Sequence, residues 1–155
     1  MADTGAIHYM QLDHIASLND EGSRLAEAVH NMAIPAMHHV FIAGLFSIYA
    51  ILTDMDYFGR EAVTWGPHMN LDTGALLSFG LEQTVLDLLQ LLPYTGQVDI
   101  APEAQCIDYT ADVDRGDARD PTFLDEDTLQ PWILRLTNGV ADGNNYLYNT
   151  HDGNV

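Results

Sequence analysis

Residues 32–52 constrain the fold most, because they contain no formally charged side chain although the whole chain carries a net charge of −18. Twenty-one such residues are long enough in principle to span a bilayer. Pro35, His38 and His39 interrupt the apolar run, both flanks are acidic, and neither arginine nor lysine stands directly at either end to set an orientation. We therefore predict a buried core helix or an oligomer interface here, and no membrane contact.

Apolar spacing predicts two helices around Pro35. Ser23 is a suitable N-cap for a first helix, whose apolar positions recur three and four residues apart at Leu25, Ala28, Val29 and Met32. Pro35 suits the first turn of a second helix, which runs through Phe41, Leu45, Ile48 and Leu52. Because this second helix is apolar nearly all round, we expect it to be central.

In the rest of the chain, segments rich in Gly and Pro alternate with segments whose apolar pattern fits a helix or a strand. Residues 57–75 read as a connection, and a leucine-rich helix is predicted from about Leu81 to Leu92, where Pro93 ends it. Residues 132–137 and 145–150 suit strands, and the intervening residues 138–144 suit a hairpin turn. The predicted fold class is α+β, with a helical N-terminal half packed on a small antiparallel sheet or hairpin at the C-terminus, in one domain over residues 1–155.

The charge of the chain is strongly one-sided. Twenty-three carboxylates face five arginines, and there is no lysine. Such a chain repels phosphate backbones and anionic lipids, so we expect neither nucleic acid nor membrane as partner, but a basic protein or peptide. The alternative is that the charge serves solubility alone.

Acidity is densest in residues 99–127, which hold ten carboxylates and two arginines and are predicted to form a long loop. The spacing of Asp112 and Asp114 suits calcium, but Gly116 and Phe123 occupy places where an EF-hand loop needs acids. A surface for a basic partner is the favoured interpretation. Its predicted residues are Asp112, Asp114, Asp117, Asp120, Asp125, Glu126 and Asp127.

Seven histidines offer the main candidates for metal ligation. His38 and His39 lie in the uncharged segment, and His30 stands eight residues before His38, a little over two helical turns away. A transition-metal site needs three or four convergent donors, so His30, His38 and His39 are the candidate ligands of a divalent metal. The alternative is that they are structural histidines with hydrogen-bond partners, in which case no cofactor is expected.

Motifs for nucleophilic catalysis and phosphate binding do not occur. There is no Gly-x-Ser-x-Gly elbow, and a Walker A loop is impossible without lysine. The single cysteine, Cys106, fits a small core residue in a reducing compartment, and Met1–Thr4 lack the basic region of a secretory signal, so we expect a cytoplasmic protein.

Three segments carry a resemblance to a known group of proteins. Leu81 to Tyr94 (LEQTVLDLLQLLPY), then PWILRLT at 131–137, then YLYNTHDG at 146–153, resemble an uncharacterised domain family of filamentous fungi. More distantly, the hairpin looks like the SUKH superfamily of fungal cell-wall regulators and bacterial toxin-immunity proteins. The resemblance covers about residues 65–155 and implies an α+β interaction module without catalytic residues to carry over.

Together these features predict a non-enzymatic protein-interaction module that meets a basic partner and self-associates through residues 36–52. The alternative is a small enzyme, either metal-dependent through the histidines or a cofactor-free cyclase or isomerase with an apolar helical pocket. No catalytic residue can be named from the sequence.

Overall fold

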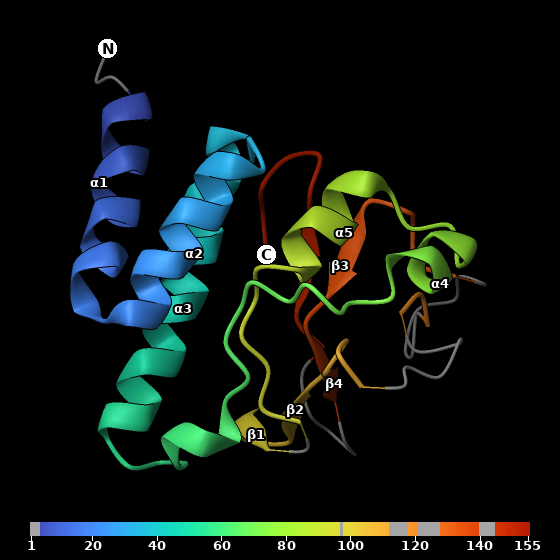
Figure 1. Cartoon of the computed structure of the whole chain (residues 1–155). Coiled ribbons are helices and arrows are strands. Elements are labelled where there is room, and N and C mark those ends of the chain that lie inside the picture. The colour runs from blue at the N-terminus through green and yellow to red at the C-terminus, as the bar shows by residue number, and fades with distance from the viewer. Residues whose placement is uncertain (1–3, 97, 112–117, 121–127, 140–144) are drawn as a thin grey trace. The chain divides into compact units, whose positions relative to one another are not determined.

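The structure is a computed structural model that describes residues 4–96, 98–111, 118–120, 128–139 and 145–155, with side chains from Gln11 onward. These residues form five α-helices, two 3₁₀ turns and five short strands. Helices occupy mostly the N-terminal half, and the strands form small antiparallel sheets near the C-terminus (Figure 1). The α+β fold class is therefore confirmed. By their internal contacts the residues fall into two compact units, the first made of residues 1–69 with 90–93 and the second of 70–89 with 94–155.

The first unit is built on three consecutive antiparallel helices (Figure 1). α1 spans Thr4–Leu18, α2 spans Asp20–Asn31, and α3 spans His39–Asp54 after the 3₁₀ turn η1 at Ala36–His38. α1 packs against both α2 and α3. Apolar side chains buried in this unit include Ile15, Leu25, Val29, Ile42, Phe46 and Tyr49.

The start of α2 differs from the prediction. Asn19, not Ser23, is the N-cap, and its side-chain oxygen accepts a hydrogen bond of 2.8 Å from the Gly22 amide. Asp20 and Glu21 follow in the first turn, where carboxylates are favoured by the helix dipole. Ser23, the predicted N-cap, lies within α2 about one turn after Asn19, and its side chain is exposed.

The remainder of the first unit closes on residues 90–92. After the 3₁₀ turn η2 at Arg60–Ala62, His68 donates its backbone amide to the Gln90 carbonyl at 2.7 Å, and its ring Nε2 lies 2.6 Å from the Leu92 carbonyl. A Cβ on Gly66 would meet the backbone of Leu91 at 2.8 Å. These contacts hold residues 66–68 directly beside residues 90–92.

The second unit contains α4 (Thr73–Ser78), α5 (Gln83–Leu89) and all five strands. The predicted helix over Leu81–Leu92 is shorter than expected, since α5 ends at Leu89, and the carbonyls of Gln90 and Leu92 beyond it lie in hydrogen-bonding contact with His68. Its predicted apolar stripe is nevertheless buried, at Leu81, Val85, Leu88, Leu89 and Leu92.

The strands form two small sheets. β3 (Ile133–Arg135) pairs antiparallel with β5 (Leu147–Asn149), with Leu134 opposite Tyr148, which confirms the predicted pairing of the two C-terminal strands. A turn over residues 150–153 follows β5 and is closed by a bridge between Asn149 and Asn154. The predicted strand over 132–137 is split, because Leu136 separates β3 from β4 (Thr137–Gly139), which joins the other sheet.

That other sheet corrects the prediction of a loop over residues 99–127. β1 (Asp99–Ala101) and β2 (Ala104–Cys106) form a hairpin, and β2 pairs with β4 so that the strand order is β1-β2-β4. Ala104 and Cys106 are buried while Gln105 between them is half-buried, the period-two pattern of a strand. Glu103 turns the hairpin with a left-handed φ of 56°. Residues 112–117 and 121–127 of the predicted loop lie outside the described residues.

Candidate functional site

The predicted histidine ligands lie at the junction of η1 and α3 and at the end of α2. His38 ends η1 and His39 begins α3, and both side chains are buried, whereas His30 is exposed in the last turn of α2. The ring Nε2 of His39 lies 2.8 Å from the Ile34 carbonyl, a backbone interaction that fixes the ring. Burial, and secondarily the neighbouring His39, lower the pKa of His38 below its ordinary 6.5. A buried neutral imidazole of this kind fits a structural role.

No group of three or more His, Cys, Asp or Glu side chains in the described part of the chain is arranged to hold a metal ion. His68, which the sequence did not single out, is buried and bonded to the Leu92 carbonyl at 2.6 Å. Of the three predicted ligands, His39 thus has its ring Nε2 beside a backbone carbonyl, as the non-candidate His68 does. A metal site at His30, His38 and His39 stays a prediction.

Of the seven carboxylates predicted to bind a partner, the structure describes Asp120. Its Oδ2 lies 3.8 Å from Nη1 of Arg135, and the Asp120 side chain is about half exposed. The other six, Asp112, Asp114, Asp117, Asp125, Glu126 and Asp127, lie outside the described residues. Next to this segment the β1–β2 hairpin exposes two further carboxylates, Asp99 and Glu103.

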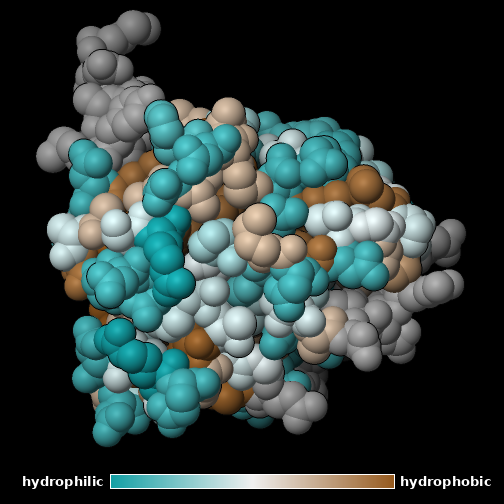
Figure 2. Space-filling view, in the orientation of Figure 1, coloured by the Kyte–Doolittle hydropathy of each residue, from teal (hydrophilic) through white to brown (hydrophobic). Residues whose placement is uncertain are grey.

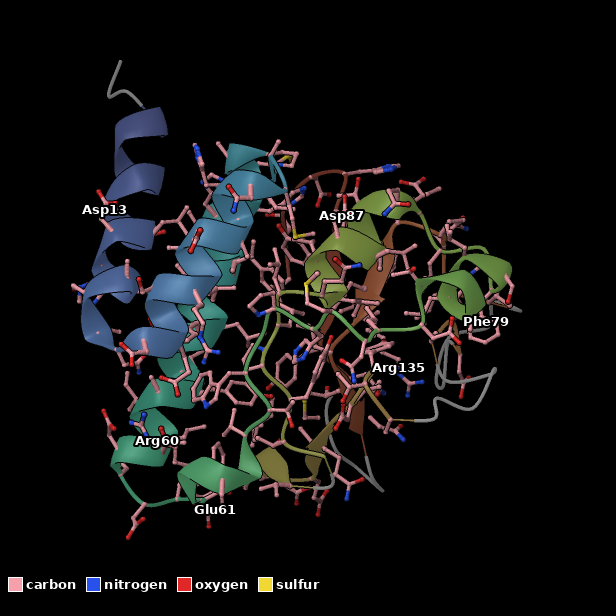
Figure 3. The ribbon with its side chains drawn as sticks, in the orientation of Figure 1. Asp13, Arg60, Glu61, Phe79, Asp87 and Arg135 are labelled. Carbon is pink, nitrogen blue, oxygen red and sulfur yellow. The ribbon has the colours of Figure 1, made fainter. Side chains whose placement is uncertain are left out.

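Arg135 is directed into the second unit, and its side chain is only 2% exposed (Figure 3). Besides Asp120, its Nη2 donates to the Asn138 amide oxygen at 2.8 Å and more weakly to Asn145 at 3.5 Å. Tyr109 donates its hydroxyl to the Arg135 carbonyl at 2.7 Å. A buried guanidinium needs several acceptors to offset its desolvation, and Asn138 of β4 and the loop residues Asn145 and Asp120 supply them.

Arg119 is likewise used within the second unit. Its Nε donates to the Leu129 carbonyl at 2.8 Å and its Nη1 to the Phe79 carbonyl at 3.1 Å, while the Leu129 amide donates back to the Arg119 carbonyl at 2.8 Å. This cation therefore joins the end of α4 to the segment around residue 129. Both described arginines of the second unit thus donate to acceptors of the unit itself, and the exposed formally charged side chains described on this unit are carboxylates, at Asp72, Asp99, Glu103, Asp120 and Asp152.

A histidine–carboxylate pair lies on a tryptophan near the C-terminal turn. Nε2 of His151 is 3.0 Å from Oε2 of Glu82, and the imidazole stacks on the indole of Trp132 with ring centroids 4.6 Å apart and planes 14° apart. The Glu82 amide donates to the Pro131 carbonyl, and Thr150 donates to the Trp132 carbonyl, so backbone contacts fix both sides. A partly exposed imidazole held by a carboxylate can accept and return a proton.

α3 carries the largest departure from the predicted burial. It buries Ile42, Ala43 and Phe46 but exposes apolar side chains along its opposite side, so it is not enclosed all round as predicted. Residues 36–54 form one helical stretch that is long and apolar enough to cross a membrane by length and composition. On the face shown in Figure 2, hydrophilic side chains cover most of the described surface, and hydrophobic ones form small separate patches.

Comparison with known proteins found no similar protein. No protein-family model matches the chain, and neither the curated proteins nor the solved structures contain a match.

Proposed function

We propose that this chain is a non-enzymatic protein-interaction module whose acidic second unit binds a basic protein or peptide. The observation that carries the proposal is the inward use of Arg119 and Arg135. By sequence the second unit holds fifteen carboxylates and three arginines. Because fifteen carboxylates outnumber three arginines, and the two described arginines donate to acceptors of the unit itself, the field outside the unit is negative.

The proposed binding surface comprises the β1–β2 hairpin and the acidic residues that follow it, up to Asp127. Asp99 is exposed at the start of β1, Glu103 is exposed in the turn of the hairpin, and Asp120 is exposed further along the chain. Partner cations would be drawn by the summed field and would pair at the surface, where each exposed pair contributes about 0.2–1 kcal/mol. Specificity would then depend on how many such pairs form together.

The test is titration of the full chain with a short oligolysine peptide at low and high salt, followed by calorimetry or fluorescence anisotropy. We expect binding that weakens as salt is raised, because exposed charge pairs are screened. The double substitution Asp99→Asn with Glu103→Gln should weaken binding about three- to tenfold at low salt.

The matched control removes the same two charges from the first unit, by Asp13→Asn with Glu27→Gln, both exposed there. If the two double variants lose affinity equally, only net charge matters and the proposed surface is wrong. Binding that does not change with salt would refute the electrostatic mechanism itself.

The alternative function is a small cofactor-free enzyme, and the Glu82–His151 pair on Trp132 favours it. Such a site would transfer protons through His151, so we would look for hydrogen–deuterium exchange into a set of carbon acids by NMR. Exchange that is lost with His151→Gln but kept with His14→Gln, an exposed histidine in α1, would establish the enzyme. Exchange at the uncatalysed rate with every compound tested would leave the interaction module as the better proposal.

A further inference from the structure

Apolar side chains form a narrow exposed stripe along η1 and α3. Met37, Val40, Ile48 and Ile51 are 41–57% exposed, and Gly44 lies exposed between them. At 100° per residue these five positions fall within about 80° of the helix circumference. We call them the α3 stripe. Ile42, Ala43 and Phe46 point to the buried side of the same helix, so the stripe is a separate face rather than the edge of the core.

Gly44 is not required by the packing of its own chain. A Cβ added there would meet no atom within 4 Å, whereas a Cβ added at Gly22 would meet the Ile15 carbonyl carbon at 2.8 Å and Phe46 Cζ at 3.3 Å. Glycine inside a helix lowers stability relative to alanine. A glycine at an exposed helix centre with open space above it leaves room for the close approach of another backbone.

Positions in the stripe are symmetric about Gly44. Met37 and Ile51 lie seven residues to either side of it, and Val40 and Ile48 lie four residues to either side. When two such helices cross antiparallel on a two-fold axis at Gly44, Met37 meets the partner's Ile51 and Val40 meets the partner's Ile48. A two-fold interface uses the same patch on both subunits, so it requires this kind of self-complementarity.

Charge singles out a second copy as the occupant. Residues 28–53 contain no Asp, Glu, Lys or Arg. This helix therefore offers no carboxylate to a basic partner. It also carries no negative charge that would repel the same helix of a second −18 chain. We infer that two copies of this chain associate through the α3 stripe, antiparallel and crossing at Gly44. This inference is independent of the basic partner, which would use the second unit.

The interface is small, and this sets the expected affinity. Five stripe positions with their half-buried neighbours Phe41, Leu45 and Leu52 fall well short of the roughly 20–30 residues per side of a standard interface. The dimer is therefore a weak one, with a dissociation constant on the order of 10–100 μM. Because each copy carries −18, raising the salt concentration screens repulsion between copies and should tighten the dimer, whereas it weakens the basic-partner complex.

The experiment is sedimentation velocity on the full chain over a range of concentrations, at low and high salt. We expect the average mass to rise from 17.1 kDa toward twice that value as concentration increases, and to do so at lower concentration in high salt. Ile48→Asp should weaken dimerisation about a hundredfold, since it buries a carboxylate against the partner's Val40. Gly44→Ala should weaken it about tenfold through overpacking while keeping the helix.

Leu77→Asp is the matched control, because Leu77 in α4 is exposed to nearly the same extent as Ile48, 49% against 51%. It should leave dimerisation unchanged. The register is tested by Gly44→Cys, which should give a disulfide-linked dimer under a mild oxidant, while Leu77→Cys should not. The native Cys106 is buried.

Four results would overturn the inference. The first is a mass that stays at 17.1 kDa at every concentration and salt. The second is a dimer that survives both Ile48→Asp and Gly44→Ala, and the third is loss of the dimer with Leu77→Asp. The fourth is binding of the wild-type chain to neutral phosphatidylcholine vesicles that is lost with Ile48→Asp. The last result would assign the stripe to a lipid surface. Loss of oligolysine binding would instead refute the proposed function and leave the dimer intact.

Discussion

Gly22 allows α1 and α2 to approach each other, so Gly22→Ala should destabilise the first unit. A Cβ at this position would overlap the Ile15 carbonyl oxygen, lie 2.8 Å from the Ile15 carbonyl carbon and 3.3 Å from Phe46 Cζ. The atoms of Ile15 belong to the backbone of α1, so they cannot move as the end of a flexible side chain could. The two helices must therefore separate, and α1 also packs on α3.

The magnitude follows from two opposing terms. Overpacking of this kind destabilises by about 1–3 kcal/mol. Replacing glycine by alanine within a helix stabilises by about 0.5–1 kcal/mol, mainly because the unfolded chain loses freedom. The N-cap bond from the Gly22 amide to Asn19 is retained, because alanine keeps the amide. Because the clash is with backbone atoms, the upper half of the overpacking range applies, and the net expectation is a loss of about 1–2.5 kcal/mol, or roughly 2–10 °C in the melting temperature.

The assay is urea unfolding followed by tryptophan fluorescence in a Trp132→Phe background, which leaves Trp65, in contact with Phe46, as the reporter of the first unit. Gly44→Ala is the control, measured at concentrations where the chain is monomeric. Since a Cβ there meets nothing within 4 Å, it should stabilise by about 0.5–1 kcal/mol. If Gly22→Ala is as stable as Gly44→Ala, the close approach of α1 and α2 does not exist as described.

Three further predictions concern polar side chains that are buried or partly buried. Burial and the neighbouring His39 lower the pKa of His38 below 6.5, so the unfolded chain gains this proton first as the pH falls through 6.5. The free energy of unfolding should therefore decrease on acidification, and it should decrease less in His38→Gln. Urea titrations at several pH values would measure both. Burial, and secondarily Asp152, raise the pKa of Tyr148 from 10.0 to about 12. In an ultraviolet titration Tyr148 should therefore ionise only well above the pH at which a tyrosine model compound does. Because the unfolded chain loses this proton first, stability should fall above pH 10.0. Arg119→Met should lower stability by about 1.5–3 kcal/mol in thermal unfolding, while Arg24→Met at an exposed position of α2 should change it by less than about 0.5 kcal/mol.

Local patterns predicted the elements whose stability depends on neighbours in the sequence. The leucine spacing from Leu81 onward located α5 and its buried side, because burial of one helical face leaves a periodic trace in the sequence. The two C-terminal strands and their pairing, with Leu134 opposite Tyr148, followed from strand propensity and the turn residues between them. In both cases the partner surface lies close in the chain.

Elements that depend on distant partners were missed. β2 is stabilised by pairing with β4, more than thirty residues away. The sequence around Ala104–Cys106 does not indicate which distant strand it pairs with. The alternation of buried Ala104 and Cys106 was a usable signal, but the surrounding carboxylates favoured a loop. Pro93 predicted the end of α5 at Leu92, but the helix ends at Leu89, and the residues after it contact the distant His68.

The candidate sites show the same limit. The sequence identified the acidic stretch and the uncharged helix, but not that Arg119 and Arg135 turn inward or that Glu82 meets His151 across 69 residues. A guanidinium is usually solvated, so a net-charge count assigns it to the surface by default. Only the positions of acceptors such as Asn138 and the Phe79 carbonyl show otherwise.

Separation of charge along the chain gives the two proposed interactions opposite responses to salt. Carboxylates concentrate in the second unit, whereas the α3 stripe lies in a run of 26 residues, 28–53, without a formal charge. Attraction between a carboxylate surface and a basic partner is screened by salt, and so is repulsion between two −18 copies that meet at a neutral stripe. The first interaction therefore weakens with salt and the second strengthens. A chain at high salt should favour its own dimer, and at low salt its basic partner. Should both interactions weaken together, the dimer would have to be held by charges outside the stripe, and the crossing at Gly44 would be the wrong interface.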